Sequence, residues 1–208
     1  MLLLVGLGNP GDEHRRQRHN VGFMAVDAIA ERHGFSPFRR RFQGEAAEGM
    51  LAGEKTLILK PQTYMNLSGQ SVGEAARFFK LQPDDVMVAH DELDLAAGKL
   101  RMKLGGGHAG HNGLRSIDAA LGPDYRRMRI GIGHPGKERV LGWVLQNFSG
   151  EDIKWLEPLL DAIAEAAPHL ARGDDNRFAT QVAQKLQPPK PAADKDKAAK
   201  PDQTDKDK

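Results

Sequence analysis

Leu2-Leu-Leu-Val-Gly-Leu-Gly-Asn-Pro-Gly11, with the Arg18-His19-Asn20 that follows, is the stretch that decides the fold. Its first residues, 2–5, form a short apolar run typical of a fully buried strand. Glycines and a proline then turn the chain sharply and leave backbone amides open to a ligand. Open α/β sheets place their sites beyond the carboxyl ends of their strands. We therefore expect Asn9 and His19 to flank the same strand end.

The spacing Gly6-x-Gly8-x-x-Gly11 also matches the glycine pattern of a dinucleotide-binding unit. That unit needs a helix that opens at the second or third glycine and binds pyrophosphate at its N-terminus. Residues 12–18 carry no apolar stripe, so the expected helix begins only at Asn20. The acid that should end a second strand would fall near Glu31, inside that helix. This context argues against dinucleotide binding.

Length and composition indicate one folded domain, over residues 1–187, and a charged tail, over residues 188–208. The tail combines prolines, lysines and aspartates without a large apolar residue. Such a segment cannot bury enough surface to offset its chain entropy, so we expect it to be disordered. The 208 residues include no cysteine, which excludes disulfides, thiolate metal sites and a cysteine nucleophile. No apolar run approaches a membrane span or a signal peptide, so we expect a cytoplasmic protein without membrane contact.

Strand and helix patterns alternate along the chain. Strands are expected near 2–5, 44–51, 56–59, 86–89, 100–104 and 128–132, and helices near 20–33, 72–79, 114–121, from 151 onward and 176–186. Pro158 is expected near a first helical turn or a kink, and Pro168 near a break. The alternation predicts an α/β fold: a single-domain, mixed, twisted sheet flanked by helices on both faces, in three αβα layers.

Positive charge is concentrated in the middle of the chain, although the net charge is only +2. Residues 95–140 hold nine lysines and arginines against three acids, and residues 15–18 and 39–41 add two more basic clusters. A basic face on a nearly neutral protein is compatible with phosphate binding. Solvated surface charge explains the same counts, and the sequence leaves both interpretations open.

Histidine, aspartate and asparagine side chains recur where strands are expected to end. Each has a structural explanation: Asn9 as a turn residue, Asn20 and Asn112 as helix caps, Asp91 as an ion-pair partner and His19 as a surface imidazole. Together they indicate chemistry. With neither a cysteine nor a Gly-x-Ser-x-Gly elbow, a histidine paired with an aspartate is suited to activating water. Asparagine amides and glycine-loop N–H groups can stabilise an oxyanion, so the set describes hydrolysis of an ester or another activated acyl group.

Metal and nucleotide chemistry fit the sequence less well. His90-Asp91-Glu92-Leu-Asp94 is an acidic cluster, but it lacks the spacing of a known metal motif, and neighbours on a strand point to opposite faces. The triple glycine, residues 105–107, is not followed by the Lys-Ser/Thr of a phosphate-binding loop. We expect no metal and no cofactor.

Six blocks, in order, make the sequence resemble the bacterial peptidyl-tRNA hydrolases over residues 2–186. They are Gly6-Leu-Gly-Asn-Pro-Gly11, Arg18-His-Asn-Val-Gly22, Lys60-Pro-Gln-Thr-Tyr-Met-Asn-Leu-Ser-Gly69, His90-Asp-Glu-Leu-Asp-Leu95, Gly105-Gly-Gly-His-Ala-Gly-His-Asn-Gly-Leu-Arg-Ser-Ile117 and Arg129-Ile-Gly-Ile-Gly-His-Pro-Gly136. The resemblance implies an enzyme that cleaves the ester between a stalled peptide and its tRNA. It also implies a monomer with peptidyl-tRNA as its nucleic-acid partner.

Residue roles follow from the resemblance as expectations. His19 would be the general base, Asp91 its orienting partner and Asn9 a substrate-positioning group. Asn66 and Asn112 would bind near the scissile carbonyl or hold the attacking water, and Tyr64 would line the same crevice. Lys103 and Arg129 would hold tRNA phosphates, and the helix after Glu151 would cover the cleft.

Three positions depart from the family pattern. His14 stands where the family usually has tyrosine, Gln17 where it has threonine and Ala109 where it has glycine. His14 keeps a polar ring, so we expect an altered substrate contact there. The alternative function is a catalytically silent RNA-binding relative of the same fold, and the presence of His19, Asp91 and the asparagines argues against it. A nucleotide-dependent oxidoreductase, a third possibility, fails on the missing helix after Gly11.

Overall fold

The computed structural model describes residues 1–187; the charged tail expected over 188–208 lies outside them. The strands are β1 (Leu2–Gly6), β2 (Arg39–Arg41), β3 (Gly44–Leu51), β4 (Glu54–Pro61), β5 (Val86–Glu92), β6 (Leu100–Leu104) and β7 (Arg126–Gly131). The helices are α1 (Val21–Arg32), α2 (Ser68–Phe79), α3 (Asn112–Leu121), α4 (Val140–Val144), α5 (Gly150–Ala166), α6 (Pro168–Ala171) and α7 (Asp175–Lys185).

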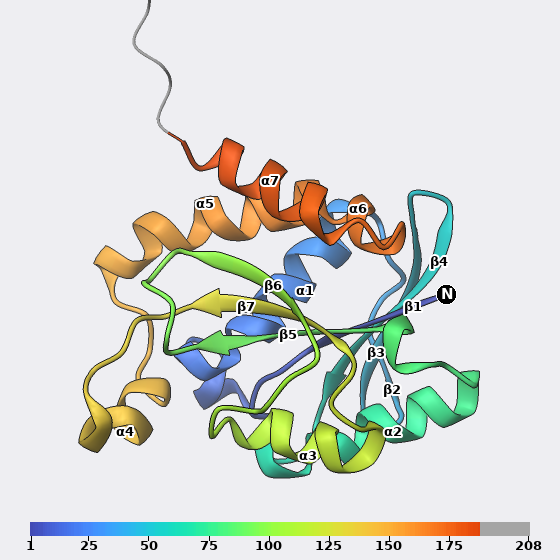
Figure 1. Ribbon diagram of the computed structural model, residues 1–208, viewed down its shortest axis with the longest axis horizontal. Helices are drawn as coiled ribbons and strands as arrows, with labels where there is room; N and C mark the ends of the chain where they lie inside the picture. The colour runs from blue at the N-terminus through green and yellow to red at the C-terminus, as the bar shows by residue number, and fades with distance from the viewer. Residues whose placement is uncertain (188–208) are drawn as a thin grey trace, which may run out of the picture.

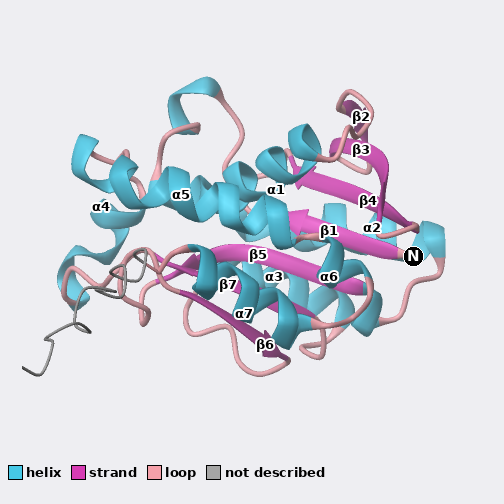
Figure 2. Cartoon of the chain, turned by 90° about the horizontal axis from the view of Figure 1, so that it is seen from above, coloured by secondary structure: helices cyan, strands magenta, loops and turns pink. Residues whose placement is uncertain are grey.

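All seven strands form one mixed sheet in the order β2-β3-β4-β1-β5-β7-β6. The central strands β4, β1, β5 and β7 are parallel, whereas β3 and β6 run antiparallel to their neighbours. Helices α1, α5, α6 and α7 cover one face of the sheet, and α2 and α3 cover the other (Figures 1 and 2). The expected three-layer α/β fold is confirmed, with the carboxyl ends of four parallel strands along one edge.

The period-two alternation of β1 supplies a separate core to each layer. Leu2 and Leu4 pack with α1 and α5, while Leu3 and Val5 pack with α2 and α3. Each of the four is at most 4% exposed, so the whole strand is buried, as its continuous apolar run predicted. A strand buried on both faces holds the loop after it in one place.

The strands expected near 44–51 and 56–59 are confirmed and form the β3–β4 hairpin, and the helix expected from Asn20 is also confirmed. Other details differ. Asn20 precedes α1, but its side chain makes no capping hydrogen bond. Pro158 lies inside α5 rather than in its first turn, while Pro168 opens α6 after a break in the helix. The short elements β2 and α4 were not predicted from the sequence. No helix among residues 1–187 is long and apolar enough to cross a membrane.

Gly22 allows α1 to approach the centre of the sheet. A Cβ atom at this position would lie 2.3 Å from the carbonyl oxygen of Ala89, in β5, and 2.5 Å from the backbone nitrogen of Leu7. Both distances are far shorter than any side chain tolerates, so only glycine permits this contact. The close approach brings the turn before α1, which carries His19, against the end of β5, which carries Asp91.

Candidate active site

His19 lies in a single 3-10 turn, Arg18–Asn20, between the loop after β1 and helix α1. The neighbouring Arg18 is buried and anchors this turn. Its guanidinium lies 3.8 Å from the ring centre of Trp143 and donates a 2.6 Å hydrogen bond to Asp152. A buried, paired arginine is costly to displace, so it holds the His19 backbone firmly in position.

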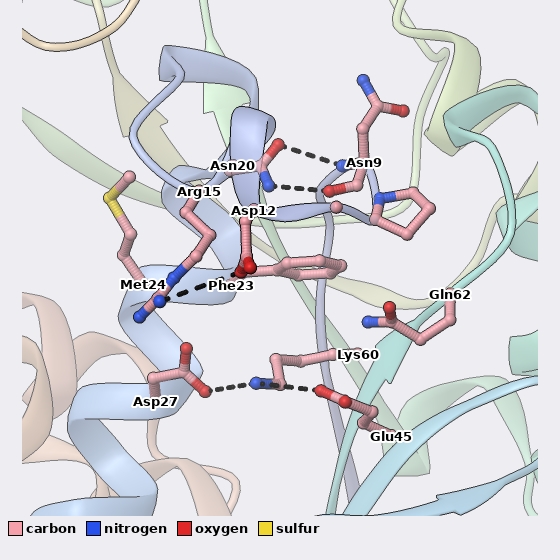
Figure 3. A pocket seen from close by; sticks show the side chains of 12 residues that line it. Asn9, Asp12, Arg15, Asn20, Phe23, Met24, Asp27, Glu45, Lys60 and Gln62 are labelled. Atoms are coloured by element: carbon pink, nitrogen blue, oxygen red, sulfur yellow. Dashed lines mark hydrogen bonds and ion pairs between the residues drawn. The ribbon is translucent and has the colours of Figure 1, made fainter.

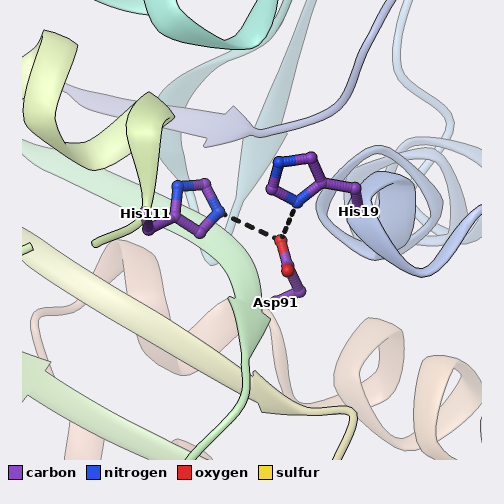
Figure 4. A group of neighbouring side chains, drawn as sticks. All are labelled: His19, Asp91 and His111. Carbon is purple, nitrogen blue, oxygen red and sulfur yellow. Dashed lines mark hydrogen bonds and ion pairs between the residues drawn. The ribbon is translucent and has the colours of Figure 1, made fainter. Parts of the chain in front are cut away.

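One oxygen of Asp91 binds two histidines (Figure 4). His19 Nδ1 lies 2.8 Å from Asp91 Oδ1, and His111 Nε2 lies 3.0 Å from the same atom. The two imidazole ring centres are 5.0 Å apart. The predicted pairing of His19 with Asp91 is present, and His111 joins it as a third member that sequence reasoning did not assign.

The backbone of α3 fixes the tautomer of His111. Its Nδ1 accepts hydrogen bonds from the backbone N–H groups of Gly113 and Leu114, so His111 rather than Asn112 is the N-cap of this helix. Because Nδ1 is the acceptor, Nε2 carries the hydrogen and donates to Asp91. With His19 Nδ1–H as the second donor, Nε2 of His19 is left unprotonated as a base.

Burial and charge act in opposite directions on the pKa values of this cluster. Burial disfavours a charged His19 ring, but the charge of Asp91 and its hydrogen bond outweigh burial and raise the pKa of His19 above its usual 6.5. Burial likewise opposes ionisation of Asp91, but His19 and His111 hold the pKa of this carboxyl well below its ordinary value. The acid therefore stays ionised at neutral pH and polarises the base.

His90 is a buried, uncharged histidine beside this cluster. Burial, and then the neighbouring His111, lower its pKa to about 4. Its ring stands edge-on to His111, with centres 5.2 Å apart, and its Nδ1 bonds to the backbone carbonyl of Asp91. A neutral imidazole here adds no positive charge that would compete with His19 for Asp91.

The ligand atoms of His19, Asp91 and His111 all lie within 4.8 Å of one another, a grouping that metals use elsewhere. However, the cap of α3 requires a proton on His111 Nε2, and a protonated nitrogen cannot be a ligand. The cluster therefore fits a hydrogen-bonded network better than an ion, and absence of a metal stays a prediction.

Asn9 is oriented by two separate sets of hydrogen bonds. Asn20 bonds to both backbone groups of Asn9, at 3.0 and 2.9 Å (Figure 3). The side-chain Oδ1 of Asn9 accepts from the backbone N–H of Met65, at 3.1 Å. Since Oδ1 is occupied, Nδ2 is left as the donor beside the crevice. Asn20 thus serves the site by holding Asn9, a role that its sequence position before a helix concealed.

Two connected hollows flank His19. One, of about 750 Å³, gathers the predicted amide and aromatic residues: Asn9, Tyr64, Asn66 and Asn112. The other, of about 550 Å³, is lined by Asp91, Lys103, Asn112 and Arg129. His19 lines both hollows, so it stands between an amide-rich side and a basic side.

His14 is the predicted site residue that the structure does not bring to this crevice. It lines neither hollow beside His19, and its Nδ1 lies 3.0 Å from Oε1 of Gln17. The expectation of a substrate contact at His14 has no support in this arrangement. The two departures from the family pattern before His19, His14 and Gln17, are instead partners of each other.

The structure also reduces the basic face expected from charge counts. Arg18 and Arg127 are buried, and Arg126 is paired with Asp175. Arg127 donates to the carbonyl oxygens of Gly106 and Gly107, so its role is to hold the glycine loop. Lys103 and Arg129 remain at the crevice, although Arg129 also donates to Glu92 at 2.8 Å. Burial and pairing thus show which basic side chains are structural and which are available at the crevice, a distinction that residue counts could not make.

The cover of the crevice is α4 rather than the helix after Glu151. Leu141 and Val144 line both hollows, and α4 lies beyond the arrowheads of β5 and β7 in Figure 1. Helix α5, which contains Glu151, packs against α1 and α7 instead. The expected cover was therefore placed one helix too late in the chain.

Ala109 adopts a left-handed backbone conformation, with φ of 46°. This conformation costs a non-glycine residue roughly 1–2 kcal/mol, which accounts for glycine as the usual residue of the family pattern. The loop keeps its shape because Arg127 holds the preceding glycines.

The fold and the site together are those of a hydrolase of α/β fold, with a histidine–aspartate pair beside amide side chains at the edge of the sheet. The chain belongs to the peptidyl-tRNA hydrolase family, whose sequence model matches residues 3–190. It is 63% identical over 191 residues to a peptidyl-tRNA hydrolase of Rhodospirillum centenum, covering 91% of this chain and 84% of that protein. It is 63% identical over 190 residues to one of Parvibaculum lavamentivorans, covering 90% and 93%. A crystal structure of peptidyl-tRNA hydrolase from Acinetobacter baumannii superposes with a TM-score of 0.83 at 41% identity, covering 88% of this chain and 94% of that one.

Proposed function

We propose that the chain hydrolyses the ester bond that joins a peptide, or an N-blocked aminoacyl group, to tRNA. The observation that carries this proposal is the 2.8 Å contact between His19 Nδ1 and an ionised, buried Asp91. Asp91 raises the pKa of His19 above its usual value, and the contact leaves Nε2 free at the crevice to act as a base. Peptidyl-tRNA is the substrate in the names of the relatives that match 90% or more of this chain.

The reaction needs no covalent enzyme intermediate. His19 Nε2 takes a proton from a water molecule, whose oxygen attacks the carbonyl carbon of the ester. The Asn9 Nδ2 group donates to the oxygen that becomes negative in the tetrahedral intermediate. That intermediate collapses, the ribose oxygen of tRNA leaves, and the protonated His19 returns the proton to it. Asp91 stays ionised throughout and stabilises the imidazolium.

The residues that line the two hollows around the His19–Asp91–His111 cluster, here called the rim, have binding roles in this proposal. Lys103 and Arg129 lie on the basic side of His19, where phosphates of the tRNA end are attracted. Tyr64, Asn66 and Asn112 lie on the opposite side or between the two, where amide and ring groups suit the peptide. This division agrees with the chemistry of a substrate that is an anion on one side of its ester and a peptide on the other.

His111 acts through Asp91 as a positioning residue. It donates to the same oxygen as His19, so it fixes the carboxylate that orients the base. Its own ring is fixed by the first N–H groups of α3.

We further infer that the protein works as a cytoplasmic monomer, without metal or cofactor, where tRNA is available.

Hydrolysis of N-acetyl-aminoacyl-tRNA in EDTA tests this function. The parent protein is expected to release the acyl group, and His19→Ala should lower kcat by about 10²–10⁴-fold, the usual contribution of a general base. Binding of tRNA by both proteins without turnover would favour the silent RNA-binding alternative. Loss of the parent's activity in EDTA would contradict the metal-independent reaction.

A further inference from the structure

Two further hollows continue along the sheet edge from Asn9, away from Lys103 and Arg129. The first hollow, of about 530 Å³, is lined by Asn9, Phe23 and Lys60 among others (Figure 3). The second, of about 720 Å³, includes Arg40 at the outer strand β2. Neither hollow contains His19, Asp91 or His111, although Asn9 lines the first hollow.

Shared residues join these hollows to the catalytic crevice. Asn9 lines both the amide-rich hollow beside His19 and the first of the two new ones. Pro10, Glu45 and Gln62 line both new hollows. The path therefore runs from His19 over Asn9 to Gln62 and on to β2.

The order of strands separates this path from the basic side. It follows the loops after β1 and β4 and the turn between β2 and β3, on one side of the sheet centre. Lys103 and Arg129 belong to β6 and β7, on the other side. Because the ester must lie at His19, a substrate with its tRNA on the basic side directs its peptide along this path.

The lining of the path suits a peptide better than RNA. Lys60 is not free for phosphate, because Asp27 lies 2.8 Å from its Nζ atom, Glu45 lies at 3.4 Å and the Phe38 ring centre at 3.9 Å. The carboxylates in the first hollow would repel a phosphate backbone. The basic clusters expected from the sequence are partly neutralised here, because Arg15 lies 3.9 Å from Asp12 and Arg41 lies 3.0 Å from Glu48. The ring of Phe23 and the amide of Gln62 offer what a peptide needs, an apolar surface and a hydrogen-bonding group.

We propose that these two hollows form an extended subsite for the peptide moiety, holding the residues that precede the one esterified to tRNA. This inference rests on the proposed function. Gln62 stands where the hollows meet, and its side chain has no hydrogen-bond partner among residues 1–187. It is therefore available to a peptide backbone that passes over Asn9.

The test compares two substrates on the same tRNA: N-acetyl-aminoacyl-tRNA and an N-acetyl-tetrapeptidyl-tRNA with the same terminal residue. For Gln62→Ala, the ratio of kcat/KM for the long substrate to that for the short one should fall about three- to tenfold, the effect of one or two lost hydrogen bonds. Gln70→Ala, an exposed glutamine on α2 outside all these hollows, is the matched control and should leave the ratio unchanged. Thermal unfolding of both variants checks that the fold is intact.

Other results would overturn the inference. An equal fall for both substrates would place Gln62 in the common part of the site, and an unchanged ratio would leave the hollows without a peptide role. Weaker binding of deacylated tRNA to Gln62→Ala would assign the path to RNA. If the parent hydrolyses neither substrate, the proposed function itself fails, whereas a parent active on both with an unchanged ratio overturns only the extended subsite.

Discussion

The catalytic cluster and the substrate rim of one crevice differ in how far the protein fixes their side chains. His19, Asp91 and His111 have side chains that are 14%, 2% and 9% exposed, and hydrogen bonds hold each in place. Tyr64 is 73% exposed, and the exposed side chain of Asn66 makes no hydrogen bond within residues 1–187. In the proposed reaction the reacting groups are therefore oriented before substrate arrives, whereas Tyr64 and Asn66 are free to adapt to it.

Asn9 and Asn66 allow the most sensitive test of this difference, because the same amide group is held by hydrogen bonds at Asn9 and is exposed at Asn66. Asn9→Ala removes a donor fixed by Met65 and should lower kcat by about 10²–10³-fold. Asn66→Ala should instead raise KM, with less than about tenfold loss in kcat. Single-turnover hydrolysis and steady-state kinetics separate the two effects. Equal losses in kcat would show that orientation in the free protein does not mark the oxyanion donor.

His111 tests whether the second imidazole serves the chemistry or only the helix. His111→Asn keeps an oxygen that can cap α3 but loses the donor to Asp91, so kcat should fall about tenfold with little change in stability. His111→Ala should lower kcat similarly and also cost about 1 kcal/mol of unfolding free energy. In both variants Asp91 serves His19 alone, so the acid limb of the pH–rate profile should move to higher pH. If His111→Asn keeps the full kcat of the parent, His111 serves only as the cap of α3.

Lys103 gives the smallest expected effect on chemistry. Lys103→Ala should weaken tRNA binding and lower the slope of log K against log salt by about 0.7–0.9, the contribution of one phosphate contact. Turnover of a short ester substrate should not change. Lys55→Ala, an exposed lysine in the distant β3–β4 hairpin, is the control. Equal losses on tRNA and on the short ester would place Lys103 in the chemistry rather than at the rim.

Sequence patterns predicted the parts of the site that follow from local order. The buried run at Leu2 and the polar residues after it fixed where Asn9 and His19 would lie, since parallel strands end at a common edge. The pairing of His19 with Asp91, 72 residues away, was expected from the family resemblance, and the structure explains it because β1 and β5 are neighbours. The resemblance to the family supplied the roles, and these stay proposals until variants are measured.

Long-range contacts explain what sequence reasoning missed. Asn20 precedes a helix and therefore resembles a cap, but its amide bonds the Asn9 backbone 11 residues earlier. Arg18 belongs to a basic run, but a ring and a carboxylate more than a hundred residues later bury it. The cover α4 has only five residues, too few to show a helical period. No local pattern could assign these partners.

The pH dependence of kcat for the parent and Asp91→Asn tests the central claim, that Asp91 tunes His19 as the base. The raised pKa of His19 predicts that parent activity falls as pH drops through a value above 6.5, because the base becomes protonated. Asp91→Asn removes the raising charge and leaves burial, so its acid limb should move below 6.5, with kcat at pH 8 about 10²–10⁴-fold lower. An acid limb at the same pH in both proteins would show that Asp91 does not set the pKa of His19.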